Sequence, residues 1–284
     1  MKINQQNTLI FEVFFFELDI IKQLIMKPHY ALKRFGQNFL TDQNVLNKIV
    51  NIIDLKNQNI IEIGPGQGAL TSHLVKAAKT VTAFEIDYNL SNFLKTNFAN
   101  TKNLKIINQD FLTTDLSVYQ NHLIVANIPY NITTQILFKI FANHQNFEHI
   151  ILMVQKEFAA RLCAKLKQSD YGKLAITTSL FYEAQAVFDV APKAFKPQPK
   201  VTSTIVYLKR KVADFDLNQA NQIMNFIKHC FIMKRKTLSN NLKQLGINQK
   251  VFETFCKQEN LDLNIRPENL SLEQYLKLFN FINS

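Results

Sequence analysis

Residues 60–71 read Ile-Ile-Glu-Ile-Gly-Pro-Gly-Gln-Gly-Ala-Leu-Thr, and this stretch decides the fold. An apolar run enters a turn that holds three glycines, and an apolar helix is expected from Ala69 to Ala78. Glycine in such a turn lets the backbone approach a ligand closely at the carboxyl end of a strand. The stretch predicts a strand, a turn and a helix of an α/β sheet with a ligand crevice. A turn of this kind serves nucleotide sites of several classes, so it does not identify the ligand.

Acidic residues recur where the strands of this sheet are expected to end. Glu85 follows the second apolar run and stands 21 positions after Gly64, a separation suited to an acid that binds ribose hydroxyls. Asp110 follows the third run, where it can accept a hydrogen bond from an adenine amine, with Phe111 beside the ring. Glu62 lies inside the first strand, where a carboxylate can hold the amino group of an amino-acid cofactor. Each acid alone also fits a solvated loop, but the repeated register predicts one edge of a parallel, Rossmann-like sheet with helices on both faces.

The sequence Asn127-Ile128-Pro129-Tyr130 follows a further apolar run at 123–126. The exocyclic amine of adenine is a poor nucleophile because its lone pair is delocalised into the ring. The Asn127 side-chain oxygen and the backbone carbonyl before Pro129 or Tyr130 can each accept one N–H of that amine and aim its lone pair outward. Tyr130 can offer its ring face to a base lifted from its stack. Alone, these four residues also describe an ordinary strand-to-loop turn.

Several helix and strand limits are predicted from caps and periodicity. Asp42 is expected to cap one helix, and Thr133 with its neighbour another. A helix that opens at Tyr171 is expected to end near Phe181. The last two strands of the sheet are predicted as a hairpin-like pair, joined by the proline-rich and basic loop 192–200, which is suited to phosphate contacts.

The chain is divided into three parts by composition. Residues 1–26 are predicted to be an amphipathic or disordered extension, and its apolar run, Leu9 to Phe16, is too short and too acidic for a membrane span. Residues 27–210 form the α/β domain, and residues 211–284 a small all-helical domain. Within the latter, the basic cluster 234–242 fits either a solvated helix end or a contact to duplex-RNA phosphates, and its charge favours RNA.

The bulk composition restricts the partner and the compartment. The 284-residue chain carries a net charge of +11 with a pI near 9.4, which favours a polyanionic partner, although a biased codon usage gives the same excess of lysine. Three separated cysteines indicate reduced thiols and a cytoplasmic location. Six scattered histidines show no zinc-ligand spacing, so no metal is expected.

Taken together, the motifs resemble the rRNA adenine N6-dimethyltransferases. The resemblance runs from about residue 27 to the C-terminus and rests on FGQNFL (35–40), IEIGPGQGALT (60–71), FEID (84–87), NQDF (108–111), NIPYNIT (127–133) and MVQKE (153–157). Three later motifs resemble the small-subunit branch of the family, namely KPQPKVTSTIV (196–206), KRKTLSNNL (234–242) and RPENLSLEQY (266–275). The N-terminal extension and the third glycine, Gly68, depart from the family pattern.

The resemblance implies a cofactor, a substrate and a set of site residues. The cofactor would be S-adenosylmethionine, held by Asn38, Leu40, Gly64, Glu85, Asp110 and Asn127. Asn127, Pro129 and Tyr130 would receive the target adenine, and Phe181 would be the second aromatic face against it. The substrate would be two adjacent adenosines in the 3′-terminal hairpin loop of small-subunit (16S) rRNA, each methylated twice on an immature 30S subunit. The protein would act as a monomer without membrane or metal.

Three alternatives remain at this point. Large-subunit rRNA methylases of the macrolide-resistance type share the first set of motifs. A ribosome-assembly factor with incidental catalysis would need the same RNA surface. A DNA adenine methylase is less favoured, because an acid usually stands there in place of Asn127.

Overall fold

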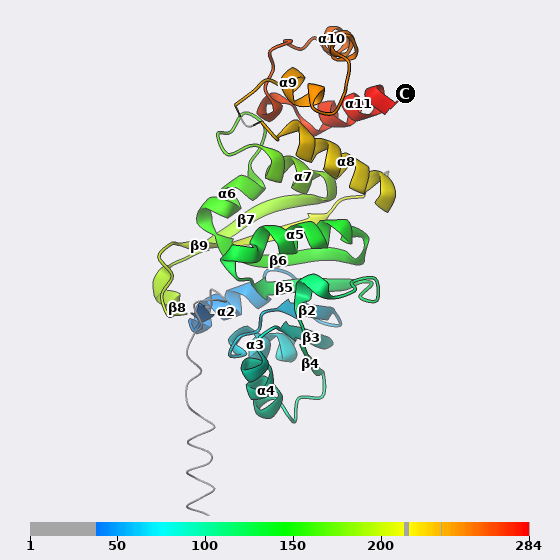
Figure 1. Cartoon of the computed structure of the whole chain (residues 1–284). Coiled ribbons are helices and arrows are strands. Elements are labelled where there is room, and N and C mark those ends of the chain that lie inside the picture. The colour runs from blue at the N-terminus through cyan, green and yellow to red at the C-terminus, as the bar shows by residue number, and fades with distance from the viewer. Residues whose placement is uncertain (1–37, 213–215, 234, 284) are drawn as a thin grey trace, which may run out of the picture.

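A computed structural model describes residues 38–212, 216–233 and 235–283. The predicted extension 1–26 and the segment 27–37 lie outside the described residues. The molecule is elongated, with the sheet in its middle, helix α4 (Tyr88–Asn97) at one end and helices α8 to α11 at the other (Figure 1). Among the described residues, no helix is both long and apolar enough to cross a membrane.

The core of the fold is a seven-stranded sheet with the order β4-β3-β2-β5-β6-β9-β7. Its strands are β2 (Asn59–Ile63), β3 (Thr80–Glu85), β4 (Leu104–Asn108), β5 (His122–Asn127), β6 (Phe147–Gln155), β7 (Tyr182–Val190) and β9 (Ser203–Arg210). The first five are parallel, whereas β9 is antiparallel to both β6 and β7. The parallel sheet and its closing antiparallel pair are both as predicted from the sequence.

The strand period of two explains how the sheet is covered on both faces. Ile61 and Ile63 of β2 belong to one buried cluster, and Ile60, which precedes them and points to the opposite face, belongs to the other. The first cluster includes the apolar faces of α5 (Thr133–Ala142), α6 (Lys156–Cys163) and α7 (Lys173–Phe181), and the second those of α2 (Gln43–Val50) and α3 (Ala69–Ala77). Parallel strands are apolar throughout because both of their faces are buried in this way.

Local signals set the helix starts. Asp42 accepts hydrogen bonds from the backbone N–H groups of Asn44 and Val45, so the predicted cap of α2 is present. Thr133 is the first residue of α5 and not its cap, because its hydroxyl donates back to the Pro129 carbonyl at 3.2 Å. The Thr133 hydroxyl therefore occupies the carbonyl oxygen of Pro129, two positions after Asn127 in the chain.

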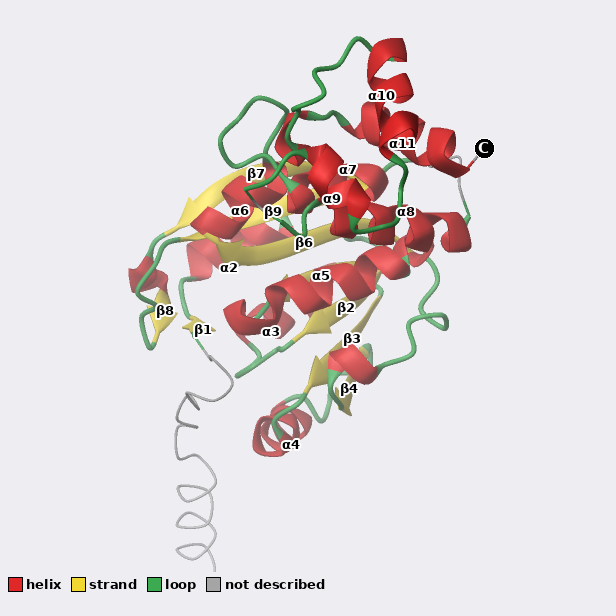
Figure 2. Ribbon diagram, turned by 45° about the horizontal axis from the view of Figure 1, so that its top comes forward, coloured by secondary structure: helices red, strands yellow, loops and turns green. Residues whose placement is uncertain are grey.

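A second, two-stranded sheet joins distant parts of the chain. Strand β1 (Phe39–Leu40) pairs antiparallel with β8 (Phe195–Lys196), so the segment before the first described helix lies beside the proline-rich loop (Figure 2). The Thr41 N–H and hydroxyl both donate to the Ala194 carbonyl, at 2.8 and 3.1 Å. The buried side chains of Leu40 and Phe195 anchor this pair in the second cluster.

Four helices follow the sheet, α8 (Leu217–Cys230), α9 (Leu238–Lys243), α10 (Gln249–Gln258) and α11 (Leu272–Asn283). Their buried residues, among them Ile227 and Leu278, belong to the same apolar cluster as Phe141 of α5 and Leu180 of α7. The helical part therefore packs on the α/β part through a shared core.

Candidate active site

A cavity of about 470 Å³ opens at the carboxyl ends of β2, β3 and β5, a size usual for small-ligand sites. It is lined by eight of the nine predicted site residues, namely Asn38, Leu40, Gly64, Glu85, Asp110, Asn127, Pro129 and Tyr130. Strand β2 pairs in parallel with β5, so the glycine turn and Asn127 emerge at the same edge of the sheet. The chain thus brings these residues together around one space.

The glycine turn allows β1 and the C-terminal end of α4 to pack closely against it. Gly66 has a φ of +59°, and a Cβ built there would lie 2.9 Å from the ring of Phe39. Gly68 has a φ of +83°, and a Cβ there would lie 2.7 Å from the Phe98 ring. The third glycine, which departs from the family pattern, is therefore required by its neighbours in this chain.

Glu85 connects the second strand to the glycine turn. One carboxylate oxygen accepts a hydrogen bond from the Gly66 N–H at 3.1 Å, and the other from the Asp87 N–H at 2.9 Å. Burial raises the pKa of Glu85, and the two backbone donors act against that rise. A carboxylate has about four lone-pair sites, so Glu85 can still accept from a ribose hydroxyl. Its role in holding the turn was not predicted from the sequence.

Glu62 is a fully buried acid beside the same turn. The Thr71 hydroxyl donates to its carboxyl at 2.7 Å, and burial raises the pKa of Glu62 to about 8, with the nearby Glu85 adding to the rise. A buried carboxyl group is suited to bind a positively charged amino group, because the positive charge would stabilise the carboxylate form of Glu62. The residue therefore fits the amino-acid portion of the proposed cofactor.

Asp110 caps a short helical turn at the other side of the cavity. Its side chain accepts a hydrogen bond from the Leu112 N–H at 2.8 Å. Phe111 is buried and packs edge-on against Phe84, with ring centroids 5.7 Å apart. The cap fixes the Asp110 carboxylate at the cavity wall, where it can accept from an adenine amine.

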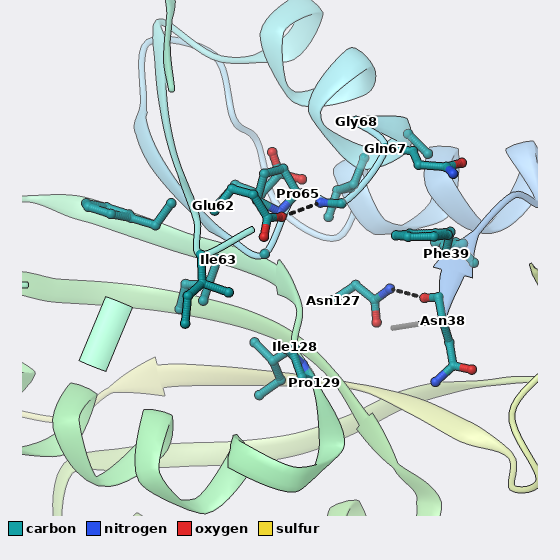
Figure 3. Close-up of a pocket in the computed structure, with 18 of the residues that line it drawn as sticks. Asn38, Phe39, Glu62, Ile63, Pro65, Gln67, Gly68, Asn127, Ile128 and Pro129 are labelled. Carbon is teal, nitrogen blue, oxygen red and sulfur yellow. Dashed lines mark hydrogen bonds between the residues drawn. The ribbon is translucent and has the colours of Figure 1, made fainter. Parts of the chain in front are cut away.

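The Asn127 amide is oriented by the segment that precedes β1. Its Nδ2 donates to the Asn38 backbone carbonyl at 3.2 Å (Figure 3). This hydrogen bond fixes which end of the amide is nitrogen, so Oδ1 is turned away from Asn38. The Pro129 carbonyl already accepts from the Ile132 N–H and the Thr133 hydroxyl. These two bonds use both lone pairs of the Pro129 oxygen. Of the two carbonyls considered, that of Ile128 is therefore the one that can act beside Asn127 Oδ1 as a second acceptor.

Tyr130 is half-buried at the cavity wall, and its hydroxyl lies 2.5 Å from the Ser203 hydroxyl. Burial raises the pKa of Tyr130, so the phenol stays neutral. Ser203 is fully buried at the start of β9. Ser203 was not predicted as a site residue, although it lies within the KPQPKVTSTIV motif.

Phe181 does not lie at this site, and its predicted role as the second aromatic face requires correction. Its side chain is 0% exposed and packs against His144 and Phe141, with ring centroids 4.5 and 5.8 Å away. Helix α7 is buried on nearly all sides, so its final phenylalanine belongs to the core between the sheet and α8. The uniformly apolar sequence of α7 was the available signal for a core helix.

No cluster of three or more His, Cys, Asp or Glu side chains suited to a metal ion occurs in the described part of the chain.

Similarity to known proteins extends over most of the chain. Residues 29–284 match the family model described as "Ribosomal RNA adenine dimethylase". The protein named "Ribosomal RNA small subunit methyltransferase A" of Mycoplasmopsis pulmonis is 46% identical over 250 residues, which cover 88% of this chain and 98% of the relative. Its namesake in Mycoplasma mobile is 44% identical over 90% of this chain and 99% of its own length.

Two solved structures share the architecture. A dimethyladenosine transferase from Plasmodium falciparum superposes with a TM-score of 0.69 at 28% identity, over 86% of this chain and 98% of its own. The 23S rRNA methyltransferase ErmE superposes with a TM-score of 0.67 at 26% identity, over 87% of this chain and all of its own.

Proposed function

Because this chain belongs to the ribosomal RNA adenine dimethylase family, we propose that it dimethylates the N6 atoms of two adjacent adenosines in the 3′-terminal hairpin loop of small-subunit rRNA. It is an S-adenosylmethionine-dependent methyltransferase of this adenine dimethylase family. The observation that carries the proposal is the Asn127 amide, which is held by Asn38 at the cavity that the glycine turn lines. The relatives named for the small subunit favour that rRNA as the substrate.

The residues of the cavity divide between cofactor and target. Glu85 and Asp110 are placed for the nucleoside portion, and Glu62 with the glycine turn for the amino-acid portion. When bound, the cofactor supplies a methyl group on a positively charged sulfur, which needs no further activation. Asn127 Oδ1 and the Ile128 carbonyl would each accept one N–H of the target amine, which aims its lone pair at that methyl group.

The proton balance requires no strong base. A bond forms between N6 and the methyl carbon as the sulfur–carbon bond breaks, and the methylated, positively charged nitrogen loses a proton to water. In the second transfer the monomethyl amine donates one N–H, so only one of the two acceptors is used. The same site can therefore serve both transfers.

We propose that the RNA is held by the helical part and by the loop 192–200. Arg235 and Lys236 are exposed on a turn that Asn241 stabilises, because the buried Asn241 side chain accepts from the Met233 N–H at 2.7 Å and donates to the Thr237 carbonyl at 3.1 Å. In the loop, the side chains of the three lysines, Lys193, Lys196 and Lys200, are exposed. Both groups offer positive charge on a fixed backbone, which suits phosphate contacts. An immature small subunit bound by one copy of the chain is the partner we propose.

A large-subunit rRNA methylase is the second candidate, favoured by the similarity to the 23S rRNA enzyme ErmE. The two are separated by expressing the chain in a host that lacks both methylases and mapping modified adenosines by primer extension across both rRNAs. We expect stops in the 3′-terminal loop of the small-subunit rRNA. Stops only in the large-subunit rRNA would refute the proposed substrate.

A role in ribosome assembly can coexist with methylation. Expression of the Asn127→Ala variant in the same host tests this directly, because the variant retains the RNA surface. Restored assembly without methylation would establish a separate binding role.

A further inference from the structure

The Tyr130 ring is tied to the sheet by a hydroxyl that does not line the cavity. Tyr130 lies at the wall, whereas Ser203 is 0% exposed and lies outside the cavity lining. Their oxygen atoms are 2.5 Å apart, a short O–H···O hydrogen bond. The two residues are far apart in sequence, so this contact exists only because β9 turns back beside β6.

Ser203 is held from both sides. Its backbone pairs with Gln155 of β6 and with Val190 of β7, so it occupies an interior position of the sheet. Next to it, the Thr204 hydroxyl donates to Asp189 at 2.7 Å, and Asp189 also forms an ion pair with Lys156 at 2.6 Å. With one side-chain torsion and a fixed backbone, Ser203 offers a hydroxyl at a nearly fixed point.

We propose that Ser203 is a positioning residue for methyl transfer, acting through the Tyr130 hydroxyl to hold the aromatic ring at the angle that receives the target adenine. The proposal rests on the proposed function, since it assumes that a base stacks on Tyr130. The phenol oxygen lies on the axis about which the ring turns, so the bond fixes the direction of that axis. The phenol O–H also prefers the ring plane, and the bond therefore restricts rotation of the ring.

This tether matters because stacking depends on the ring plane. A flipped base gains its stacking energy only against a ring face, and small misplacements of a reacting group cost large factors in rate. Asn127 can orient the amine only if the base arrives in the matching plane. By holding the Tyr130 ring, Ser203 thus sets the plane of the stacked base and the direction in which its amine faces Asn127.

The test uses variants that delete the same bond from either side. Ser203→Ala and Tyr130→Phe both keep the aromatic ring, and we expect each to lower kcat about tenfold on small ribosomal subunits that lack the modification. The double variant is expected to be no slower than the slower single variant, because only one bond is lost. The affinity for S-adenosylhomocysteine, measured by calorimetry, and the melting temperature should stay close to those of the parent chain.

A matched control separates positioning from folding. Ser179→Ala removes another serine hydroxyl that donates within the fold, to the Ile176 carbonyl at 2.9 Å, and Ser179 lies outside the cavity lining. Ser179→Ala should leave kcat unchanged. Ser203→Thr keeps a hydroxyl at position 203 and should therefore be much faster than Ser203→Ala, with most of the parental kcat.

Two results would overturn the positioning role while leaving the proposed function in place. One is a parental kcat in a folded Ser203→Ala variant, and the other is a loss of rate that follows the folded fraction alone. A parent chain that transfers no methyl group to small-subunit rRNA would instead refute the proposed function, and with it the base that Tyr130 is held to receive.

Discussion

At position 127 the side chain must both donate and accept. Its nitrogen donates to the Asn38 carbonyl, and in the proposed reaction its oxygen accepts from the target amine. A carboxylate there would place oxygen against oxygen, so the neutral amide suits this position electrostatically.

We expect Asn127→Ala to lower methyl transfer by a factor of about 10² to 10³, the loss typical of one oriented polar group at a reacting centre. Binding of S-adenosylhomocysteine should change by a few-fold at most, since the glycine turn and Glu85 remain. Single-turnover transfer to unmodified small subunits and calorimetry measure the two effects. Asn51→Ala, at an exposed asparagine whose side chain donates to the Asn47 carbonyl, is the matched control. Retained dimethylation in the Asn127 variant would contradict the role given to the amide.

Glu62 makes the stability of the fold depend on pH. Burial raises the pKa of Glu62 from 4.5 to about 8, so between these values the unfolded chain releases a proton that the folded chain keeps. The contribution of Glu62 to the free energy of unfolding is therefore fully present below about pH 4.5 and is lost as the pH rises towards about 8. Above about pH 8 it changes no further.

We therefore expect Glu62→Gln to reduce the fall in melting temperature between pH 5 and about pH 8.5, because glutamine keeps an acceptor for Thr71 but does not ionise. Differential scanning calorimetry at the two pH values measures this. Glu183→Gln on β7, where the acid is exposed, should leave the difference as it is in the parent. An unchanged difference in the Glu62 variant would mean that burial does not hold this carboxyl in its neutral form.

Among the elements, the glycine turn and β1 act as one unit. The approach of Phe39 to Gly66 leaves no room for a side chain, and both lie at the cavity. Any displacement of β1 would also move the Asn38 carbonyl that orients Asn127.

Two glycine substitutions isolate this effect. Gly66 and Gly246 both have positive φ values, +59° and +73°, but a Cβ would meet Phe39 at the first and nothing within 4 Å at the second. Alanine at Gly246 should cost about 1 kcal/mol in free energy of unfolding, from the positive φ alone, and alanine at Gly66 should cost more, because its Cβ also meets the Phe39 ring. Only Gly66→Ala should weaken cofactor binding, by at least about tenfold. Calorimetric titration of both variants measures the difference, and equal affinities would show that β1 does not close on the turn.

The elements also show what a sequence can predict. Strand ends and their acids follow from hydrophobic period and turn residues, so the sequence alone predicts that Glu85, Asp110 and Asn127 are neighbours. The β1–β8 pair and the Ser203 contact were not predicted, because they join segments more than 70 positions apart with no local signal. Phe181 was misplaced for a related reason: an aromatic residue at the end of an apolar helix has the same local pattern in a core as at a stacking site.

At the scale of the molecule, the positive charge should act mainly where the RNA lies. Arg235 and Lys236 are exposed in the segment between α8 and α9. These helices lie at one end of the molecule, and α4 lies at the opposite end (Figure 1). If charge alone drove binding, positive residues at either end would matter equally. If the helical end holds the RNA, charge reversals there should cost more than the same reversals near α4.

The decisive comparison is a pair of double variants with the same change in net charge. Arg235→Glu with Lys236→Glu should weaken binding to unmodified small subunits and reduce the slope of log K against log salt by about two. Lys95→Glu with Lys102→Glu alters two exposed lysines in and beside α4, and should change the affinity far less. Binding is measured by filter retention at several salt concentrations, and S-adenosylhomocysteine titration confirms that the cavity is intact in both. Equal losses in the two variants would assign the affinity to overall charge, and the helical end would then no longer be the RNA-binding part.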